Sequence, residues 1–151
     1  MIGEAKQELK RADHLIFVSL KYTRTMDVLD SVVKRLVSTM ELIVGTLLQW
    51  LLKKKKIKEI PESYKSKIEV VRANFKRDEI IQDFLKFYSF LLRVDKGHHE
   101  GRSEFRKGVT MTSTSELGDV IDEVNLDKIK EYYLKTLEYV DYIEEMLNKK
   151  K

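Results

Sequence analysis

The chain has 151 residues, of which 42% are hydrophobic and 36% charged, and its net charge is +4. This length fits a single domain, residues 1–151, and the lack of cysteine excludes disulfides, thiolate nucleophiles and thiolate metal sites. One proline and six glycines are too few for the many turns of a β-sandwich or barrel. The polar start, Met1–Lys6, lacks the apolar stretch of a signal peptide, so we expect a cytoplasmic protein.

The first predicted helix spans residues 4–22. Its apolar residues recur at spacings of three and four and therefore share one helical face: Leu9, Ala12, Ile16 and Leu20. The stretch 15–20 is apolar throughout and would by itself also fit a strand, but the helix formers before it favour a helix. His14 follows Asp13, and neighbours in sequence do not face each other on a helix. We interpret His14 as a boundary histidine rather than a catalytic base.

The second predicted helix, residues 28–56, is the strongest signal in the chain. Only a narrow polar stripe interrupts its apolar surface: Lys34, Ser38, Glu41, Gly45, Gln49 and Lys53. Such a helix can lie at the centre of a bundle, pack against a second chain or cross a membrane. Its uninterrupted apolar part, 37–52, is short for a span of roughly 20 residues. It also carries Glu41, whose carboxylate is unfavourable in hydrocarbon. We therefore predict a central bundle helix and no membrane.

The apolar width of this helix exceeds one bundle face, which predicts a homodimer. The predicted interface combines residues of this helix with two tyrosines of the last helix that lie seven positions apart and so share a face: Leu36, Ile43, Leu47, Trp50, Tyr132 and Tyr139. Tyr132 and Tyr139 could alternatively stack on nucleic-acid bases beside Lys128 and Lys135. The lysine runs 53–56 and 149–151 are interpreted as cations at helix C-termini, which the helix dipole favours, rather than as a nucleic-acid site.

The remaining segments predict three more helices and one long loop. Pro61 opens a helix that continues to Phe75, Asp78 caps a helix over 79–94, and Asn125 caps the last helix, 126–149. Residues 96–123 hold four of the six glycines and a Thr/Ser stretch, so we expect a loop that is extended or mobile. Long loops in compact domains are often functional. The sequence thus predicts an all-α, up-and-down bundle of about five helices.

One motif has the elements of catalysis. Arg93 is followed, after a four-residue spacer, by His98, with His99 next to it. An imidazole can transfer a proton near neutral pH, and a guanidinium can stabilise developing phosphate charge.

Here the chain resembles the HEPN superfamily, small helical bundles whose nuclease members carry an Arg, a spacer of four to six residues and a His. The resemblance implies a HEPN-like bundle that often dimerises, and a metal-independent ribonuclease with Arg93 and His98 as catalytic residues. The chain departs from the family pattern at Val94, where a polar residue is usual. The chain is also similar to small archaeal helical proteins in two further stretches: residues 12–18 followed by Tyr22-Thr23, and Phe105-Arg106 followed by Val109-Thr110.

Other chemistry has little support in the sequence. Several potential metal ligands lie close together in the chain: Asp95, His98, His99, Glu100 and Glu104. Adjacent histidines on a loop rarely converge on one ion, and the Glu-x-x-His pairs of di-iron bundles are lacking. No glycine-rich phosphate loop and no helix-turn-helix pattern are evident. We therefore predict no metal, no cofactor and no sequence-specific DNA binding.

Three functional hypotheses remain open. The favoured one is a non-catalytic interaction module that homodimerises, based on the apolar width of the second helix. The alternative is a HEPN-type ribonuclease or RNA-binding, toxin-like protein that uses Arg93 and His98. A third is the binding of a nucleotide or small molecule in a pocket at the end of the bundle, under the segment 96–123.

Overall fold

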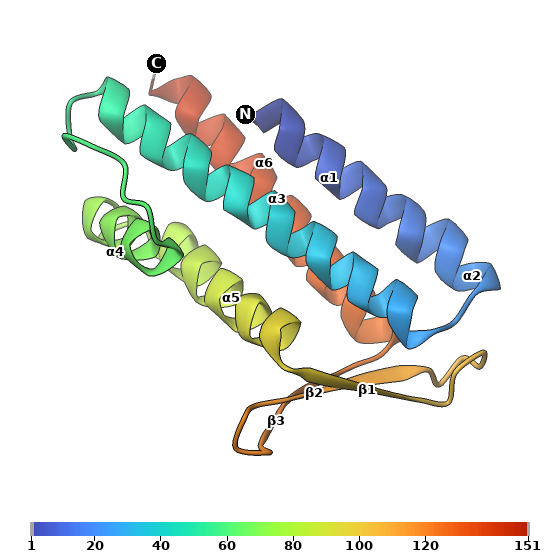
Figure 1. Ribbon diagram of the computed structural model, residues 1–151. Coiled ribbons are helices and arrows are strands. Elements are labelled where there is room, and N and C mark those ends of the chain that lie inside the picture. Colours follow the sequence, from blue (N-terminus) through green and yellow to red (C-terminus); the bar gives the residue numbers. More distant parts are fainter. Residues whose placement is uncertain (1, 151) are drawn as a thin grey trace.

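The structure, a computed structural model, describes residues 2–150 as a bundle of helices with a small β-sheet at one end (Figure 1). The first rod consists of α1 (Ile2–His14), a π-helical stretch η1 (Leu15–Ser19) and α2 (Leu20–Tyr22). The other helices are α3 (Met26–Lys53), α4 (Tyr64–Asn74), α5 (Glu79–Lys96) and α6 (Leu126–Lys149). Both described ends of the chain lie at the end of the bundle opposite the sheet.

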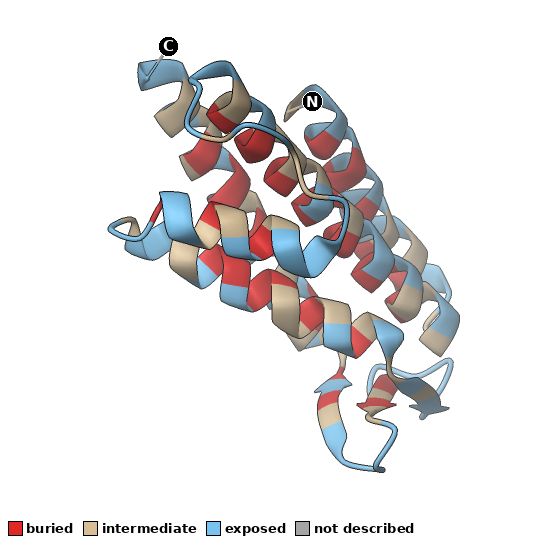
Figure 2. Ribbon diagram, turned by 60° about the vertical axis from the view of Figure 1, so that its left-hand side comes forward, coloured by how far each residue is buried: buried red, intermediate tan, exposed pale blue. Residues whose placement is uncertain are grey.

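Helix α3 is the central element, as the sequence predicted. It contacts α1, α4, α5 and α6, and its side chains are buried on several sides, including Leu29, Leu36, Ile43 and Leu51. In Figure 2 the buried residues lie on the sides of the helices that face one another. α3 is long and apolar enough to cross a membrane. The core helix of a folded domain meets the same criteria of length and composition. The apolar width of α3 is therefore covered by the helices of its own chain.

The prediction of an all-α fold is wrong for the segment 96–123, which forms an antiparallel sheet. Its strands are β1 (His98–Arg102), β2 (Thr110–Thr114) and β3 (Val120–Val124), in the order β1-β2-β3. The fold is therefore mixed α and β, although mostly helical. One face of the sheet is turned toward the bundle. The residues on this face are paired across the strands: His99 with Ser113, Ser113 with Asp122, and Met111 with Val124.

A polar cluster ties the sheet to the bundle. The Lys34 ammonium group lies 3.1 Å from Asp30 and 2.8 Å from Asp95, which joins α3 to α5. His99 Nε2 lies 2.7 Å from the Val94 carbonyl, and its Nδ1 lies 3.4 Å from Asp30. Because these groups come from α3, α5 and β1, the cluster fixes the sheet against the ends of both helices.

The helix caps predicted at Asp78 and Asn125 are confirmed, whereas the helix predicted to open at Pro61 begins at Tyr64, with Ser63 as its cap. Asp78 accepts a hydrogen bond from the Ile81 amide at 3.0 Å, and Asn125 accepts one from the Lys128 amide at 2.9 Å. Thr25 accepts from the Val28 amide at the start of α3. These caps satisfy amides that have no partner inside their helices, and they set where α3, α5 and α6 begin.

Candidate functional site

A groove of about 650 Å³ lies between α4, α5 and the sheet. Its lining comes from all three elements: Tyr64, Lys65, Ile68, Glu69 and Arg72 of α4, Ser89, Leu92, Arg93 and Lys96 of α5, and Gly97, Ser115, Glu116 and Ile121 from the sheet region. The volume is within the range of roughly 300–1,000 Å³ typical of small-molecule sites. The groove is thus large enough for a small ligand.

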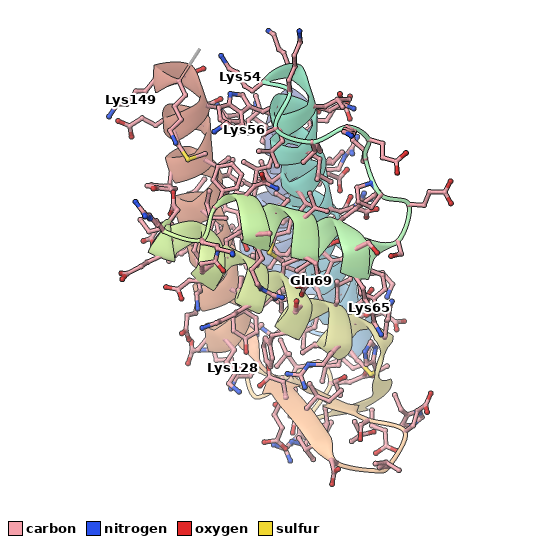
Figure 3. All side chains as sticks on the ribbon, turned by 90° about the vertical axis from the view of Figure 1, so that its left-hand side faces the viewer. Lys54, Lys56, Lys65, Glu69, Lys128 and Lys149 are labelled. Atoms are coloured by element: carbon pink, nitrogen blue, oxygen red, sulfur yellow. The ribbon has the colours of Figure 1, made fainter. Side chains whose placement is uncertain are left out.

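Two helices each turn one stripe of side chains into this groove. On α5 the lining residues recur at spacings of three and four, which places Ser89, Leu92 and Lys96 on one face. The same spacing on α4 aligns Lys65 with Ile68. Figure 3 shows Lys65 and Glu69 on the side of α4 that faces the sheet end of the molecule. Ile68 and Leu92, which also pack against the hydrophobic core, supply an apolar floor.

The third wall depends on a bulge in the sheet. Thr114 pairs with Val120 and Ser113 pairs with Asp122, so Ile121 is the extra residue of β3 and has no partner. A bulge redirects the side chain that it carries, and Ile121 lines the groove. The wall is also close to Gly97, where an added Cβ would lie 2.3 Å from Ser113 Oγ and 2.8 Å from the Thr114 carbonyl. Glycine is therefore required at the joint between α5 and β1.

The rim of the groove is mainly cationic. Four basic side chains, Lys65, Arg72, Arg93 and Lys96, face two carboxylates, Glu69 and Glu116. Arg72 is already paired with Glu69 on its own helix. Within residues 2–150, the other three cations form no ion pair with a carboxylate. The groove therefore offers an excess of positive charge beside an apolar floor, because only Glu116 remains to offset the three cations.

Aromatic rings hold two of these cations in place. The Lys96 ammonium group lies 4.1 Å from the centre of the Tyr64 ring, and the Arg93 guanidinium lies 5.9 Å from the centre of the Phe90 ring. Cation–π contacts of this kind restrict the side chains without neutralising them. An arriving anion would meet cations whose positions are already restricted, which lowers the entropy lost on binding.

The predicted catalytic pair is divided between two surroundings. Arg93 lines the groove, whereas His98 is not among the lining residues. Side chains alternate along a strand, and because His99 faces the bundle, His98 faces away from it. The His98 side chain is 70% exposed and lies 3.4 Å from Glu100. The assignment of Arg93 and His98 as catalytic residues stays a prediction.

Three of the other sequence leads, Asp95, His99 and Glu104, have structural partners. Asp95 and His99 belong to the polar cluster with Lys34, and Glu104 accepts a hydrogen bond from the Met26 amide at the start of α3. His14 lies away from the groove, in a hollow of about 350 Å³ with basic residues of α1 and α3. Within residues 2–150, no group of three or more His, Cys, Asp or Glu side chains is placed to hold a metal ion.

The predicted dimer interface lies mostly inside the single chain. Leu36, Ile43 and Leu47 have no exposed surface, and Tyr139 is 8% exposed. Trp50 is half-buried beside Phe75, at a ring distance of 6.0 Å. These side chains already pack against their own chain, so they offer little surface to a second copy. Self-association itself stays a prediction, and it would need other residues.

Tyr132 has an internal role as well. Its hydroxyl donates a hydrogen bond of 2.5 Å to Asp122 of β3, and Lys128 lies 2.6 Å from the same carboxylate. Burial, together with the hydrogen bond to Asp122, raises the pKa of Tyr132 above its ordinary value. The ring also packs against Phe87 and Phe90 of α5. Tyr132 therefore fixes the sheet to α6 rather than presenting a ring to bases.

Several groove residues carry no signal that sequence patterns could have revealed. Ser115, Glu116 and Ile121 lie in the segment that was expected to be a loop. Tyr64 and Ile68 lie in the helix that was predicted from Pro61 to Phe75, and nothing in the sequence distinguished them from its other residues. Comparison with known proteins gives no match to a protein-family model, a curated protein or a solved structure.

Proposed function

We propose that this protein is a non-catalytic binding module, whose groove between α4, α5 and the sheet holds a small molecule with an apolar body and an anionic group. The observation that carries the proposal is the combination of an apolar floor with three cations, Lys65, Arg93 and Lys96, that form no ion pair with a carboxylate within residues 2–150 and outnumber the remaining groove carboxylate, Glu116. A purely apolar ligand would leave these cations without a partner, and a purely ionic one would leave the floor exposed.

The two parts of the ligand would contribute in different ways. Burial of an alkyl body against Ile68, Leu92 and Ile121 stabilises the complex by roughly 25 cal/mol per Å² of apolar surface removed from water. A carboxylate or phosphate placed near Arg93 and Lys96 accepts charge-assisted hydrogen bonds, which are stronger than neutral ones. The apolar part supplies affinity, and the anionic part supplies orientation and selectivity.

Isothermal titration calorimetry with three probes of equal chain length tests this. The probes are decanoate, decanol and decylammonium, each used below the concentration at which it forms micelles. We expect decanoate to bind at least about tenfold more tightly than the other two, which corresponds to about 1.4 kcal/mol. Equal binding of all three probes, or no binding of decanoate, would contradict the proposal.

A matched pair of variants on α5 locates the charge effect. Arg93→Gln removes a groove cation, and Lys86→Gln removes an exposed cation of the same helix that does not line the groove. We expect Arg93→Gln to weaken decanoate binding by about five- to tenfold, while Lys86→Gln changes it less than about twofold. Similar effects of the two substitutions would place the binding outside the groove.

The non-catalytic part of the proposal has its own test. The purified protein is incubated with labelled RNA in the presence of a metal chelator. We expect no cleavage above the background of a His98→Ala sample. Cleavage by the native protein that His98→Ala abolishes would support the ribonuclease alternative, in which Arg93 and His98 act together, and would remove this part of the proposal.

A further inference from the structure

A second charged surface lies at the end of the bundle opposite the sheet. The cations called here the basic end come from three places: Lys53, Lys54, Lys55 and Lys56 at the end of α3 and Lys149 and Lys150 at the end of α6 lie at this end, and Lys76 and Arg77 belong to the turn between α4 and α5, which lies partway along the bundle. Figure 3 shows Lys54, Lys56 and Lys149 at this end of the molecule. Lys151, which extends the run in sequence, lies outside the described residues.

Contacts join the three groups into one surface. The ammonium groups of Lys56 and Lys150 lie 5.6 Å and 6.0 Å from the centre of the Trp50 ring, so one indole is shared by cations from α3 and α6. Lys150 also lines a polar hollow of about 690 Å³ together with Lys76 and Arg77. A chain of neighbouring cations therefore runs from the end of α3 across α6 to the turn before α5.

Carboxylates do not balance this charge. Lys149 pairs with Glu145 at 3.2 Å on the surface. Asp78 and Glu79 line the polar hollow, but Asp78 accepts hydrogen bonds from the Ile81 amide and from the Tyr142 hydroxyl. Within residues 2–150, Lys53 to Lys56 form no ion pair with a carboxylate. Of the eight cations, only Lys149 forms an ion pair with a carboxylate within residues 2–150.

Helix capping does not account for four lysines in a row. The helix dipole favours cations in the last turn of a helix, where Lys53 lies. Lys54 to Lys56 follow that turn, and Lys55 has φ of 59°, a left-handed conformation in which glycine is the favoured residue. A lysine that is conformationally unfavourable and close to other lysines opposes folding locally. A cluster of cations of this kind attracts polyanions.

We propose that the basic end binds the phosphate backbone of a nucleic-acid duplex without reading its sequence. Single strands are usually bound by exposed aromatic rings that stack on bases, but Trp50 is half-buried under two lysines and Phe75 is buried. A polybasic surface can also attract anionic lipid headgroups by charge, and apolar side chains that insert strengthen such binding. Among the described residues at this end, Ile80 is the one large apolar side chain that is exposed. A hydrophilic polyanion with regularly spaced charges fits this surface best.

Fluorescence anisotropy with a labelled DNA duplex of about 20 base pairs tests the proposal. When phosphate contacts drive binding, the logarithm of the association constant falls linearly with the logarithm of the salt concentration, with a slope of about −0.9 for each contact. The test variant replaces Lys54, Lys55 and Lys56 by Gln, and the control replaces Lys10, Lys86 and Lys107, three exposed lysines at other places. Both variants lose the same net charge. We expect the test variant to bind at least about tenfold more weakly near 100 mM salt, and the control less than about threefold.

A second variant protects the test against local misfolding. Lys149→Gln with Lys150→Gln removes cations of α6 and leaves the end of α3 intact, and it is expected to weaken duplex binding by about three- to tenfold. Equal losses in the test and control variants, or no duplex binding at low salt, would overturn the proposal. Tighter binding of a single-stranded RNA of equal length, or of vesicles that contain anionic lipid, with the same dependence on Lys54 to Lys56 would also overturn it.

Discussion

Two tyrosine hydroxyls are held where their charged form is unfavourable. Burial, with a smaller contribution from Glu41, raises the pKa of Tyr88 to about 12, and burial with the bond to Asp122 raises the pKa of Tyr132. An unfolded tyrosine titrates near 10. The neutral hydroxyls therefore add stability that is complete below about pH 10 and is lost as the pH rises toward the folded pKa.

Replacement of Tyr88 by Phe is expected to reduce this alkaline sensitivity. Urea unfolding at about pH 8 and about pH 11 gives the loss in free energy of unfolding between the two conditions. We expect a smaller loss in Tyr88→Phe than in the native chain, because the group that resists ionisation is gone. Tyr22→Phe, at a residue that is 77% exposed, is the control and should lose as much as the native chain. A native-like loss in Tyr88→Phe would show that this hydroxyl is not responsible.

The joint between α5 and β1 depends on one small residue. Ser113 Oγ donates a hydrogen bond to the Val94 carbonyl at 2.7 Å, so it cannot move away from Gly97 without losing that bond. The Thr114 carbonyl is part of the sheet and is equally fixed. Gly97 also lines the groove. The residue that allows α5 and β2 to pack closely therefore also shapes the groove.

Gly97→Ala is expected to destabilise the protein by about 1–3 kcal/mol, since the added methyl group forces the backbone of β2 away from α5. Denaturant unfolding measures this change. Gly3→Ala is the matched control, because nothing lies within 4 Å of its added Cβ and the residue is inside α1. Because Gly3 is the second residue of α1, alanine there should change the stability by less than about 0.5 kcal/mol. A neutral effect of Gly97→Ala would mean that the sheet is not packed this closely.

Helices could be predicted at this scale, and strands could not. Helix α6 begins and ends where the sequence placed it, and α3 and α5 differ by two or three residues. Their apolar stripes are long enough to show a helical period. Strand β1 contains no apolar residue, and the inner face of β2 carries only Met111 and Ser113. A period of two cannot be recognised in strands so short and polar, so the third wall of the groove was missed.

The central position of α3 determines the stability of the whole molecule. Leu47→Ala is expected to lower the free energy of unfolding by about 2–5 kcal/mol, because the side chain is fully buried within the chain. Leu134→Ala, at a residue that is 53% exposed, should cost less than about 0.5 kcal/mol. Denaturant unfolding gives both values, and light scattering gives the mass. A small cost for Leu47→Ala together with a lower mass would show that Leu47 belongs to a subunit interface.

The molecule has different surfaces at its two ends. The sheet end carries the groove, with an apolar floor and cations held by rings, while the opposite end carries the basic surface. The sequence showed cations of each surface, the run 53–56 at the basic end and Arg93 in the groove. It did not show which other residues lie beside them in the structure. Which residues come together in the groove depends on the packing of α4 against α5 and on the bulge at Ile121. Neither follows from a pattern along the chain.

Ligand binding in the groove is the central claim, and methyl NMR spectra of protein labelled at isoleucine δ1 carbons test it most directly. Decanoate is titrated below its micelle concentration, and each isoleucine reports on its own surroundings. The account predicts the largest shifts at Ile68 and Ile121, which line the groove, and little change at Ile16 and Ile129, which are buried elsewhere. Shifts spread evenly over all isoleucines, or largest at Ile16, would contradict it.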